Sequence, residues 1–475
     1  MASEYKTPGV YIEEIPHLPP SIASVETAIP AFIGYTEKAQ WKKEDDLLNK
    51  PWRITSMLEY EQYFGYPDQE KESLSVVFTN GGREINAEVD ESKRSKYLMH
   101  YSLQMFYANG GGPCWITSVG NYAISGGQVE AEKLIDGLDE VAKINEVTLL
   151  LFPDSINLST ETDYYNVHDT AIEQCVALQD RFTILDVFHL PDNGNVWRLD
   201  IELLRNTLSG TTDDLKYAAV YFPKIYAGVD FNYRIPGTLI NDDSLVKLEG
   251  AQGGAQTLAE LKKINNAQYY QAKSAINNIQ MLMPASSALA GIYAQVDNAR
   301  GVWKAPANVN IDNAIRPEFL INKEGQKDLN VDVVAGKSIN VIRTFEGRGP
   351  AIVWGARTLA GNDNEWRYIP VRRYFNMVEE SVKNATEQFV FEPNDENTWV
   401  RVKSMIQNYL TQQWKAGALM GASTKEAFFV HIGLGETMTE LDIWEGRLIV
   451  EIGMAVVRPA EFIILRFMHK MLQES

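Results

Sequence analysis

Short apolar segments alternate with helical patterns through the first half of the chain. Helical spacing of apolar residues predicts a helix over Tyr97 to Ala108, and His168 to Gln179 has the length of a crossover helix. The apolar segments are typical of buried strands, and they are Ala28 to Tyr35, Cys114 to Val119, Val147 to Phe152, Phe182 to Phe188 and Tyr217 to Phe222. This alternation predicts βαβ units around a largely parallel sheet.

Several other stretches differ from this pattern in composition and in the secondary structure they predict. Asn80 to Lys96 is polar and suggests a surface loop or small excursion, and Ile240 to Gln280 suggests a loop or linker followed by a helix. From Met281 onward we expect a dense series of turns and strands, including Ser338 to Phe345 and Ala351 to Trp354. A second domain is therefore expected to begin near Met281.

The clearest helical pattern runs from Trp399 to Ala416. Its apolar residues fall on one stripe, which predicts an amphipathic helix that ends at Gly417. Three cations lie off that stripe: Arg401, Lys403 and Lys415.

Both ends of the chain have strand-like segments. The amino-terminal segment lies between Gly9 and Pro16, and its key residues are Val10, Tyr11, Ile12, Glu13 and Ile15. The carboxy-terminal segment follows a strand predicted over Leu448 to Val456, and its key residues are Phe462, Ile463, Ile464, Leu465 and Phe467. Periodicity leaves a helix open for this last segment. The amino-terminal segment either pairs as an edge strand of its own sheet or finds backbone partners elsewhere.

Composition narrows the classes of partner. Asp and Glu outnumber Lys and Arg 63 to 44, giving a net charge of -19, which opposes binding to nucleic acid and to anionic membranes. The sequence contains no run of 18 apolar residues, so we expect no direct membrane insertion. The beginning of the sequence has no basic region followed by an apolar stretch, so we expect synthesis in the cytoplasm without an export signal. Both cysteines, Cys114 and Cys175, are interpreted as buried thiols.

The patterns that carry chemistry each fail at a named position. Gly336, Lys337 and Ser338 resemble the end of a phosphate-binding loop, but Val331 stands where that loop needs glycine. The glycines at 110–112 come after a helix and before a strand, the reverse of a dinucleotide fingerprint. The six histidines are scattered, without the spacing of a metal site. We therefore expect no catalytic residues, no cofactor and no metal.

One enzymatic alternative stays open at this stage. An α/β enzyme would place its active site at the carboxyl ends of the central parallel strands. Asp154 and Asp186 follow or end two such strands and are its candidate residues.

Several motifs occur in one order from about Pro284 to the end of the chain. They are RGVWKAPAN (Arg300 to Asn308), NVIRTFEGRG (Asn340 to Gly349), VWGARTL (Val353 to Leu359), EWRYIPVRRYF (Glu365 to Phe375), FVFEPND (Phe389 to Asp395) and RPAEFI (Arg458 to Ile463). Together with the opening strings TPGVYIEEI and AIPAFIGYTE, they resemble the contractile tail sheath family of bacteriophages, pyocins and extracellular contractile injection systems. The middle of the chain resembles the family more loosely.

The resemblance implies a multi-domain α/β protein, α+β overall, in which an α/β domain is inserted into a sheath core built from both chain ends. The implied parts are an amino-terminal arm (1–20), a first part of the core (21–112) with an excursion near 38–96, the inserted domain (113–280), the carboxy-terminal core (281–458) and a terminal strand or arm (459–475). Five motif arginines are expected to form bidentate carboxylate pairs within or between subunits: Arg343, Arg348, Arg357, Arg372 and Arg373.

The resemblance also implies a structural role without catalysis. By this resemblance, the subunits would assemble with one another in a helical array of stacked, hexameric rings around an inner tube protein, with baseplate and cap proteins as further partners. The array belongs to a phage tail or to a released injection particle. Strand-like arms would pair with sheets of neighbouring subunits, and the helix carrying Arg401, Lys403 and Lys415 is the candidate face toward the tube.

Overall fold

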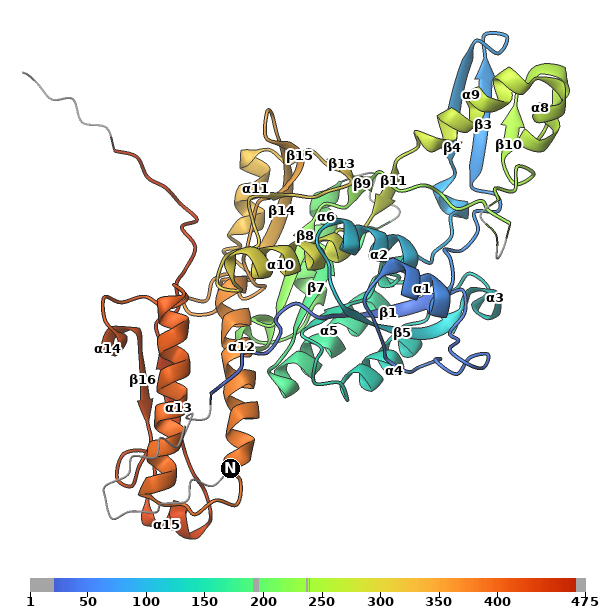
Figure 1. Cartoon of the computed structure of the whole chain (residues 1–475). Coiled ribbons are helices and arrows are strands. Elements are labelled where there is room, and N and C mark those ends of the chain that lie inside the picture. The colour runs from blue at the N-terminus through green and yellow to red at the C-terminus, as the bar shows by residue number, and fades with distance from the viewer. Residues whose placement is uncertain (1–20, 191–195, 236–237, 239, 467–475) are drawn as a thin grey trace, which may run out of the picture. The chain divides into compact units, whose positions relative to one another are not determined.

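The computed structural model describes residues 21–190, 196–235, 238 and 240–466 (Figure 1). The described chain forms two compact units. The larger unit comprises residues 26–377 and 458–466, and the smaller unit comprises residues 21–25 and 378–457. The division between Met377 and Val378 falls within one long helix, α12 (Ile369–Thr386).

A nine-stranded sheet forms the centre of the larger unit, in the order β12-β15-β14-β8-β7-β6-β1-β5-β2. Its six neighbouring strands from β14 to β5 are all parallel, which confirms the predicted parallel sheet and the α/β class. The strands are β1 (Pro30–Thr36), β2 (Trp52–Ile54), β5 (Cys114–Asn121), β6 (Leu149–Leu151), β7 (Phe182–Asp186), β8 (Ala218–Phe222), β12 (Val309–Asn310), β14 (Ile339–Phe345) and β15 (Gly349–Val353).

The sheet is buried on both faces, which explains why its strands are continuous apolar runs. Alternate residues of β1 point to opposite faces: Phe32 belongs to one buried cluster, while Ala31 and Ile33 belong to the other. Helices α2 (Met99–Ala108) and α10 (Ser286–Arg300) pack on the first face. Helices α4 (Ala131–Val141) and α5 (Glu161–Leu178) pack on the second face (Figure 1).

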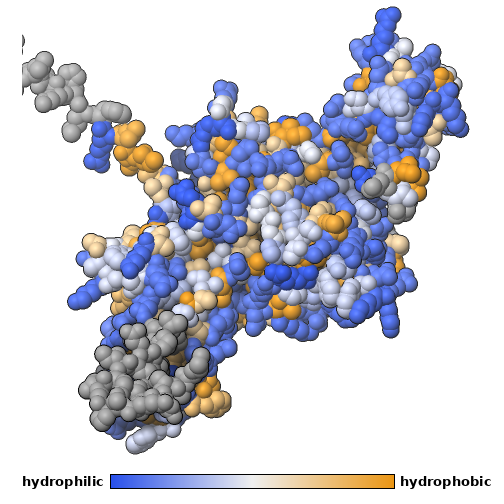
Figure 2. Space-filling model, in the orientation of Figure 1, coloured by the Kyte–Doolittle hydropathy of each residue, from blue (hydrophilic) through white to orange (hydrophobic). Residues whose placement is uncertain are grey.

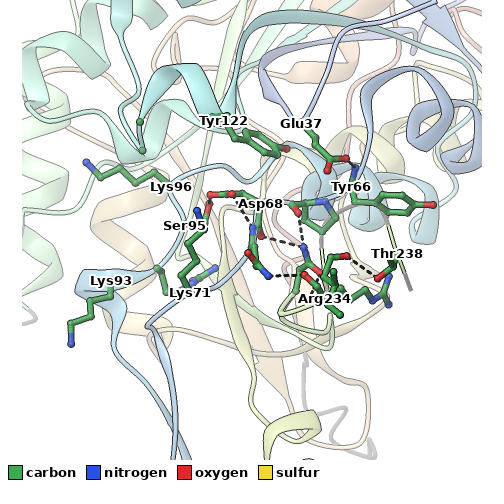
Figure 3. A pocket seen from close by; sticks show the side chains of 18 residues that line it. Glu37, Tyr66, Asp68, Lys71, Lys93, Ser95, Lys96, Tyr122, Arg234 and Thr238 are labelled. Carbon is green, nitrogen blue, oxygen red and sulfur yellow. Dashed lines mark hydrogen bonds between the residues drawn. The ribbon is translucent and has the colours of Figure 1, made fainter. Parts of the chain in front are cut away.

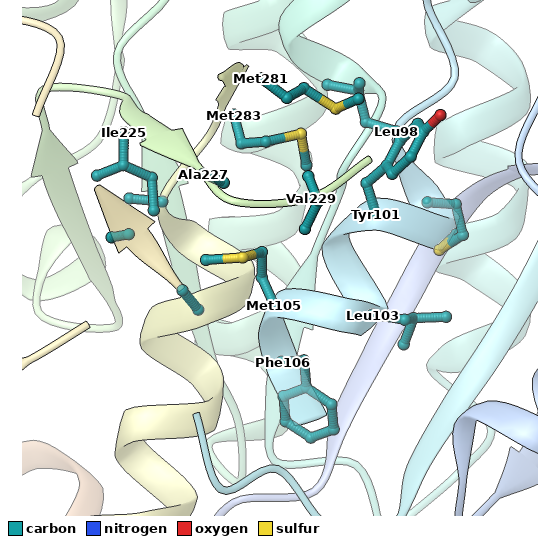
Figure 4. Close-up of a cluster of buried hydrophobic side chains, with 14 of the residues drawn as sticks. Leu98, Tyr101, Leu103, Met105, Phe106, Ile225, Ala227, Val229, Met281 and Met283 are labelled. Atoms are coloured by element: carbon teal, nitrogen blue, oxygen red, sulfur yellow. The ribbon is translucent and has the colours of Figure 1, made fainter. Parts of the chain in front are cut away.

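The cluster on the first face extends beyond the central sheet. Side chains of α2, including Tyr101 and Met105, approach Val229 and the methionines of β11 (Figure 4). Strand β11 belongs to a three-stranded sheet in the order β11-β9-β13. Its strands are β9 (Ile225–Ala227), β11 (Met281–Met283) and β13 (Ala314–Pro317).

A third sheet of the larger unit accounts for the polar excursion. Strand β4 (Glu84–Val89) lies inside the stretch expected to be a surface loop, and it pairs with β3 (Leu74–Thr79), which also pairs with β10 (Lys247–Glu249). Its side chains alternate between exposed and half-buried, so it lacks the apolar run by which the buried strands were found. Helices α8 (Leu258–Ile264) and α9 (Asn266–Asn277) occupy the stretch expected as linker and helix.

The expectation of mainly turns and strands after Met281 is wrong for two long helices. Helix α10 is built largely from Ser, Ala and Gly, so its sequence SSALAGIYA lacks a wide apolar stripe. Helix α12 contains Pro370 near its start, where a missing N–H costs little because the first helical N–H groups have no partner within the helix. Strands β14 and β15 were predicted in place.

The remaining helices of the larger unit are shorter or peripheral. They are α1 (Met57–Phe64), α3 (Tyr122–Ser125), α6 (Trp197–Thr207), α7 (Thr212–Leu215) and α11 (Lys323–Asn330). Strands from residues 21–112, 113–280 and 281–458 share the central sheet, in one compact unit. The functional domain boundaries implied by the resemblance stay a prediction.

The smaller unit is built around helix α13 (Glu396–Lys415), which confirms the clearest helix prediction. The Asp395 side chain caps its start by accepting a hydrogen bond from the Thr398 N–H at 3.0 Å. The helix packs on β16 (Phe428–His431), which pairs antiparallel with β17 (Glu451–Met454). The unit also contains α14 (Thr424–Ala427) and α15 (Glu440–Trp444).

A glycine sets the distance between α4 and the central sheet. A Cβ atom at Gly137 would lie 2.5 Å from Val119 Cγ1 and 2.8 Å from Ile33 Cγ2, both in the buried face beneath the helix. We expect Gly137→Val to destabilise the protein by about 1–3 kcal/mol through overpacking. Thermal unfolding followed by circular dichroism measures this loss.

The matched control is Gly112→Val, because a Cβ at Gly112 meets nothing within 4 Å. Equal melting temperatures for the two variants would contradict the close packing of α4.

Candidate functional site

The carboxy-terminal segment leaves the larger unit with its apolar side chains exposed. Phe462, Ile463, Ile464 and Leu465 are between 69% and 80% exposed, and residues 458–466 form neither helix nor strand. Figure 2 shows these strongly apolar residues on the extended segment. Consecutive exposed residues of this kind are typical of a binding segment. The predicted strand pairing stays a prediction, and Phe467 lies outside the described residues.

The amino-terminal candidates lie outside the described residues. They are Val10, Tyr11, Ile12, Glu13 and Ile15. The described chain begins just after them, and its first contacts fall in the smaller unit. Val25 N–H donates to Ser381 Oγ at 3.0 Å, and the hydroxyls of Ser24 and Tyr409 are 3.0 Å apart.

The smaller unit contains a sheet of only two strands, β16 and β17. Their register pairs Phe428 with Met454 and His431 with Glu451. Within the described residues no third strand joins this sheet. Two-stranded sheets are marginal alone, and their outer edges carry backbone groups that can pair with another chain.

The three candidate tube-facing cations lie on α13 in different settings. Arg401 is exposed and forms an ion pair with Glu392 at 3.4 Å. Lys403 is half-buried and lies 3.8 Å from a carboxylate oxygen of Glu436. Lys415 is exposed at the last position of the helix. Arg401 and Lys415 are exposed and Lys403 is half-buried, and their contact with a tube stays a prediction.

Sequence reasoning missed one exposed apolar loop, between α12 and α13. Phe391 is fully exposed and adopts φ of 71°, a conformation that bulky residues rarely adopt. Its neighbour Val390 is also exposed. Exposed apolar side chains held in such a backbone conformation are candidates for a contact surface. The FVFEPND motif contained the signal, because two apolar residues flank the start of a polar, proline-containing turn.

Among the five motif arginines, Arg357 and Arg373 form the expected bidentate carboxylate pairs within the chain. Arg357 donates to Glu461 from Nε at 2.9 Å and from Nη2 at 2.6 Å. Arg373 donates to Asp297 from Nη1 at 3.1 Å and from Nη2 at 2.5 Å. The others donate to side-chain amide oxygens, with Arg343 on Gln326, Arg348 on Asn308 and Arg372 on Asn376.

The candidates of the enzymatic alternative are both buried and bonded to the backbone. Asp154 accepts from the N–H groups of Tyr35 at 2.7 Å and Leu98 at 2.5 Å. Asp186 accepts from the N–H groups at the start of α10, with Ala285 N–H at 2.7 Å. Burial raises the pKa of Asp154 to about 7 and that of Asp186 to about 6. Both carboxylates therefore tie strand ends to neighbouring elements.

A pocket of about 590 Å³ lies beyond the carboxyl ends of β1 and β5 (Figure 3). Neither Asp154 nor Asp186 lines it. Its two acidic side chains already accept hydrogen bonds, Glu37 from Tyr66 N–H and Asp68 from Ser95 Oγ–H. The described residues that line the pocket include no histidine and no cysteine.

The residue that suggested a phosphate-binding loop has a structural role. Lys337 Nζ donates to the carbonyl oxygens of Arg205 at 2.8 Å and Leu208 at 2.5 Å, at the end of α6. A lysine here satisfies carbonyls that the helix leaves unpaired. The motif is thus the turn before β14, as its broken pattern indicated. Both cysteines are buried free thiols, as interpreted from the sequence.

The described residues gather no group of His, Cys, Asp and Glu able to hold a metal ion. Among the helices of the described chain, none is long and apolar enough to span a membrane.

Comparison with known proteins identifies the relatives of this chain. A family model for the phage tail sheath C-terminal domain matches residues 361–469. The sheath of PVC, an extracellular contractile injection system in the contracted state, is 30% identical with a TM-score of 0.62 over 99% of both chains. The contracted helical sheath of the anti-feeding prophage is 29% identical with a TM-score of 0.63, over 98% of this chain and 100% of that chain.

A phage relative matches over a shorter stretch. The tail sheath protein of Vibrio phage KVP40 is 28% identical over 138 residues, which are 28% of this chain and 20% of that protein. The chain therefore spans about a fifth of this curated relative's length. The protein belongs to a class of structural proteins found in contractile tails and contractile injection systems. It belongs to the contractile tail sheath family, which confirms the resemblance found in its motifs.

The raised pKa of the buried Asp154 carboxyl predicts how the stability of the fold depends on pH. Its folded pKa of about 7 lies above the ordinary 3.8, so the folded protein holds a proton that the unfolded chain releases. The contribution of Asp154 to the free energy of unfolding therefore falls as pH rises from 3.8 to about 7. Asp154→Asn removes the ionisation, so the melting temperature of the variant relative to wild type should rise between about pH 4 and 7 and then level off.

Asp136→Asn is the matched control, because Asp136 is exposed on α4. A constant difference between Asp154→Asn and wild type across that range would contradict the inferred protonation of Asp154.

Proposed function

We propose that this chain is the repeating subunit of a contractile sheath. Copies assemble in a helical array of stacked, hexameric rings around an inner tube, and shortening of the array drives the tube through a target envelope. The observation that carries the proposal is the family relationship, which extends over 99% of the chain for the PVC sheath. A baseplate complex of the anti-feeding prophage is also among the relatives, at 29% identity, which supports baseplate contact as part of the role.

Pairing of donated strands is the proposed link between subunits. The segment from Phe462 to Leu465 exposes apolar side chains that a partner sheet would cover. The two-stranded β16–β17 sheet has outer edges that can accept such strands, because backbone N–H and C=O groups there need partners. The amino-terminal residues Val10 to Ile15 are proposed as a second donated strand on their sequence alone.

Contraction in this proposal needs no nucleotide and no catalysis. The extended array would be a kinetically trapped state that relaxes to a state with more buried contact. Lys337 supports this view, because its ammonium group is already bonded to two backbone carbonyls. Asp154 and Asp186 support it too, since both serve as backbone acceptors.

The tube is proposed to contact the smaller unit along α13. Arg401, Lys403 and Lys415 present positive charge there on a chain whose net charge is -19. These cations would suit acidic groups on the tube protein, which would compete with Glu392 and Glu436 for Arg401 and Lys403. The exposed loop at Phe391 is a further surface of this unit that we expect to contact another protein.

The donated strands make the first functional prediction. Removing residues 1–20, or all residues after Glu461, should abolish helical arrays in negative-stain electron microscopy, because each copy loses a strand that links it to others. Circular dichroism and thermal unfolding should stay close to wild type, since the described core contains neither segment. Ile463→Asp with Leu465→Asp should have the same effect with the full chain length retained.

The matched control for the double variant is Ile264→Asp with Leu320→Asp. These side chains are 52% and 79% exposed and lie away from both chain ends. Normal arrays from the truncated chains would refute strand donation.

The tube contact makes a second prediction. Lys403→Glu with Lys415→Glu should reduce co-assembly with the tube protein, because the reversed charges repel an acidic partner. Co-sedimentation of the tube protein with the assembled sheath measures the loss, which should weaken as salt is added.

Lys425→Glu is the control, since Lys425 is an exposed cation on α14 of the same unit. If the α13 variant co-assembles as well as this control, α13 is not the tube-facing helix.

A further inference from the structure

Three of the sequence motifs meet at one carboxylate. Glu461 from RPAEFI accepts hydrogen bonds from Arg357 of VWGARTL, at 2.9 Å from Nε and 2.6 Å from Nη2. Tyr368 of EWRYIPVRRYF donates its hydroxyl to the same carboxylate at 3.1 Å. Asn330 completes the group, with Nδ2 donating at 2.7 Å. We call these four residues the arm clamp: Asn330, Arg357, Tyr368 and Glu461.

The arm clamp is nearly closed to solvent and its donors are well satisfied. The Arg357 side chain is 4% exposed and that of Glu461 is 21% exposed. Arg357 Nη1 donates to the carbonyl oxygens of Asn330 at 3.3 Å and Gly361 at 3.2 Å. In a buried bidentate pair, two parallel charge-assisted hydrogen bonds fix the orientation of both side chains. Removing one partner leaves the charge of the other uncompensated.

The arm clamp is fastened to the central sheet through one amide. Asn340 lies in β14, and its side chain holds the Arg357 backbone on both sides, accepting from the N–H at 2.8 Å and donating to the carbonyl oxygen at 2.7 Å. The same amide nitrogen also donates to Val220 O of β8 at 3.1 Å. Arg357 is therefore fixed against two adjacent parallel strands.

A glycine permits this close approach. A Cβ at Gly355 would lie 2.7 Å from Asn340 Oδ1 and 2.9 Å from Asn340 Cα. Any side chain there would push the VWGARTL segment away from β14. Gly355 thus allows the VWGARTL segment to lie close enough to β14 for Asn340 to bind the Arg357 backbone.

The arm clamp marks a sharp change along the chain. On one side, Arg458 Nη1 donates to Asn364 O at 2.6 Å and Glu461 is held by the clamp. On the other side, Phe462 to Leu465 are exposed. The hydrogen-bonded residues therefore end at Glu461, and the exposed apolar residues begin at the next position, Phe462.

We propose that Arg357, Tyr368 and Asn330 are positioning residues that hold Glu461 as the root of the donated carboxy-terminal strand. This inference rests on the proposed sheath function. When a neighbouring copy pulls on the strand, the clamp passes the force to β14 and β8. Without it, the force would reach residue 457, whose N–H donates to Ala418 O in the smaller unit, and would pull on the pairing that leads to β17.

Acid should weaken the arm clamp. Burial opposes ionisation of Glu461, but hydrogen bonds from Arg357, Asn330 and Tyr368 outweigh it and leave its pKa below the ordinary value of 4.5. The clamp is therefore fully formed above that value and is lost as pH falls through the folded pKa.

The test uses the full chain with Glu461→Gln, which keeps the side-chain size and removes the charge. Arg357→Lys is a second variant, because it keeps the charge and loses the two-pronged geometry. We expect the concentration needed for arrays to rise about tenfold or more in both variants. Hydrogen exchange followed by mass spectrometry should increase in residues 458–461 and stay unchanged in the central strands.

The matched control is Glu70→Gln, which removes a carboxylate from another buried ion pair, the one with Arg94. Arrays of Glu70→Gln should still form at the wild-type concentration, because Glu70 lies outside the arm clamp. Normal assembly of both clamp variants overturns the inference, as does a loss of assembly in all three variants that simply follows their loss of stability. Absence of arrays from the wild-type chain overturns the proposed function itself.

Discussion

Six parallel strands, hydrogen-bonded side by side and covered by helices on both faces, are the constraint on which the rest of this protein depends. Parallel strands need connections that cross a face of the sheet, so the chain must supply helices to both faces. Asp154 and Asp186 sit at the carboxyl ends of these strands and tie them to neighbouring elements through backbone hydrogen bonds. The sheet is thereby a rigid support for segments that leave the body.

The proposed functional surfaces are extended segments and edges, and the buried carboxylates Asp154 and Asp186 have structural roles. The segment that begins at Phe462 exposes apolar side chains to solvent. The two-stranded β16–β17 sheet has outer edges whose backbone N–H and C=O groups can pair with another strand. The arm clamp joins the first of these to the central sheet through Arg357 and Asn340. In the proposed assembly, the strands that stabilise the fold therefore also support the contact between copies.

Much of this could be predicted from the sequence, because buried parallel strands and the amphipathic α13 carry strong local patterns. Helix α10 could not, since its small residues form no wide apolar stripe. Strand β4 does alternate apolar Ile85, Ala87 and Val89 with polar residues, but the pattern is short and lies in an otherwise polar stretch. The motifs gave the order of Arg357, Tyr368 and Glu461 along the chain. Their meeting at one carboxylate depends on tertiary contacts between residues 93 and 104 positions apart, which a local pattern does not contain.

Strand donation between copies is the central claim, and a cryo-electron microscopy map of the assembled protein tests it most directly. The account predicts a helical array in which strands from neighbouring copies, one of them beginning at Phe462, lie along the outer edges of β16 and β17. A map of an array in which those edges stay unpaired, and each carboxy-terminal segment folds back on its own copy, would contradict it.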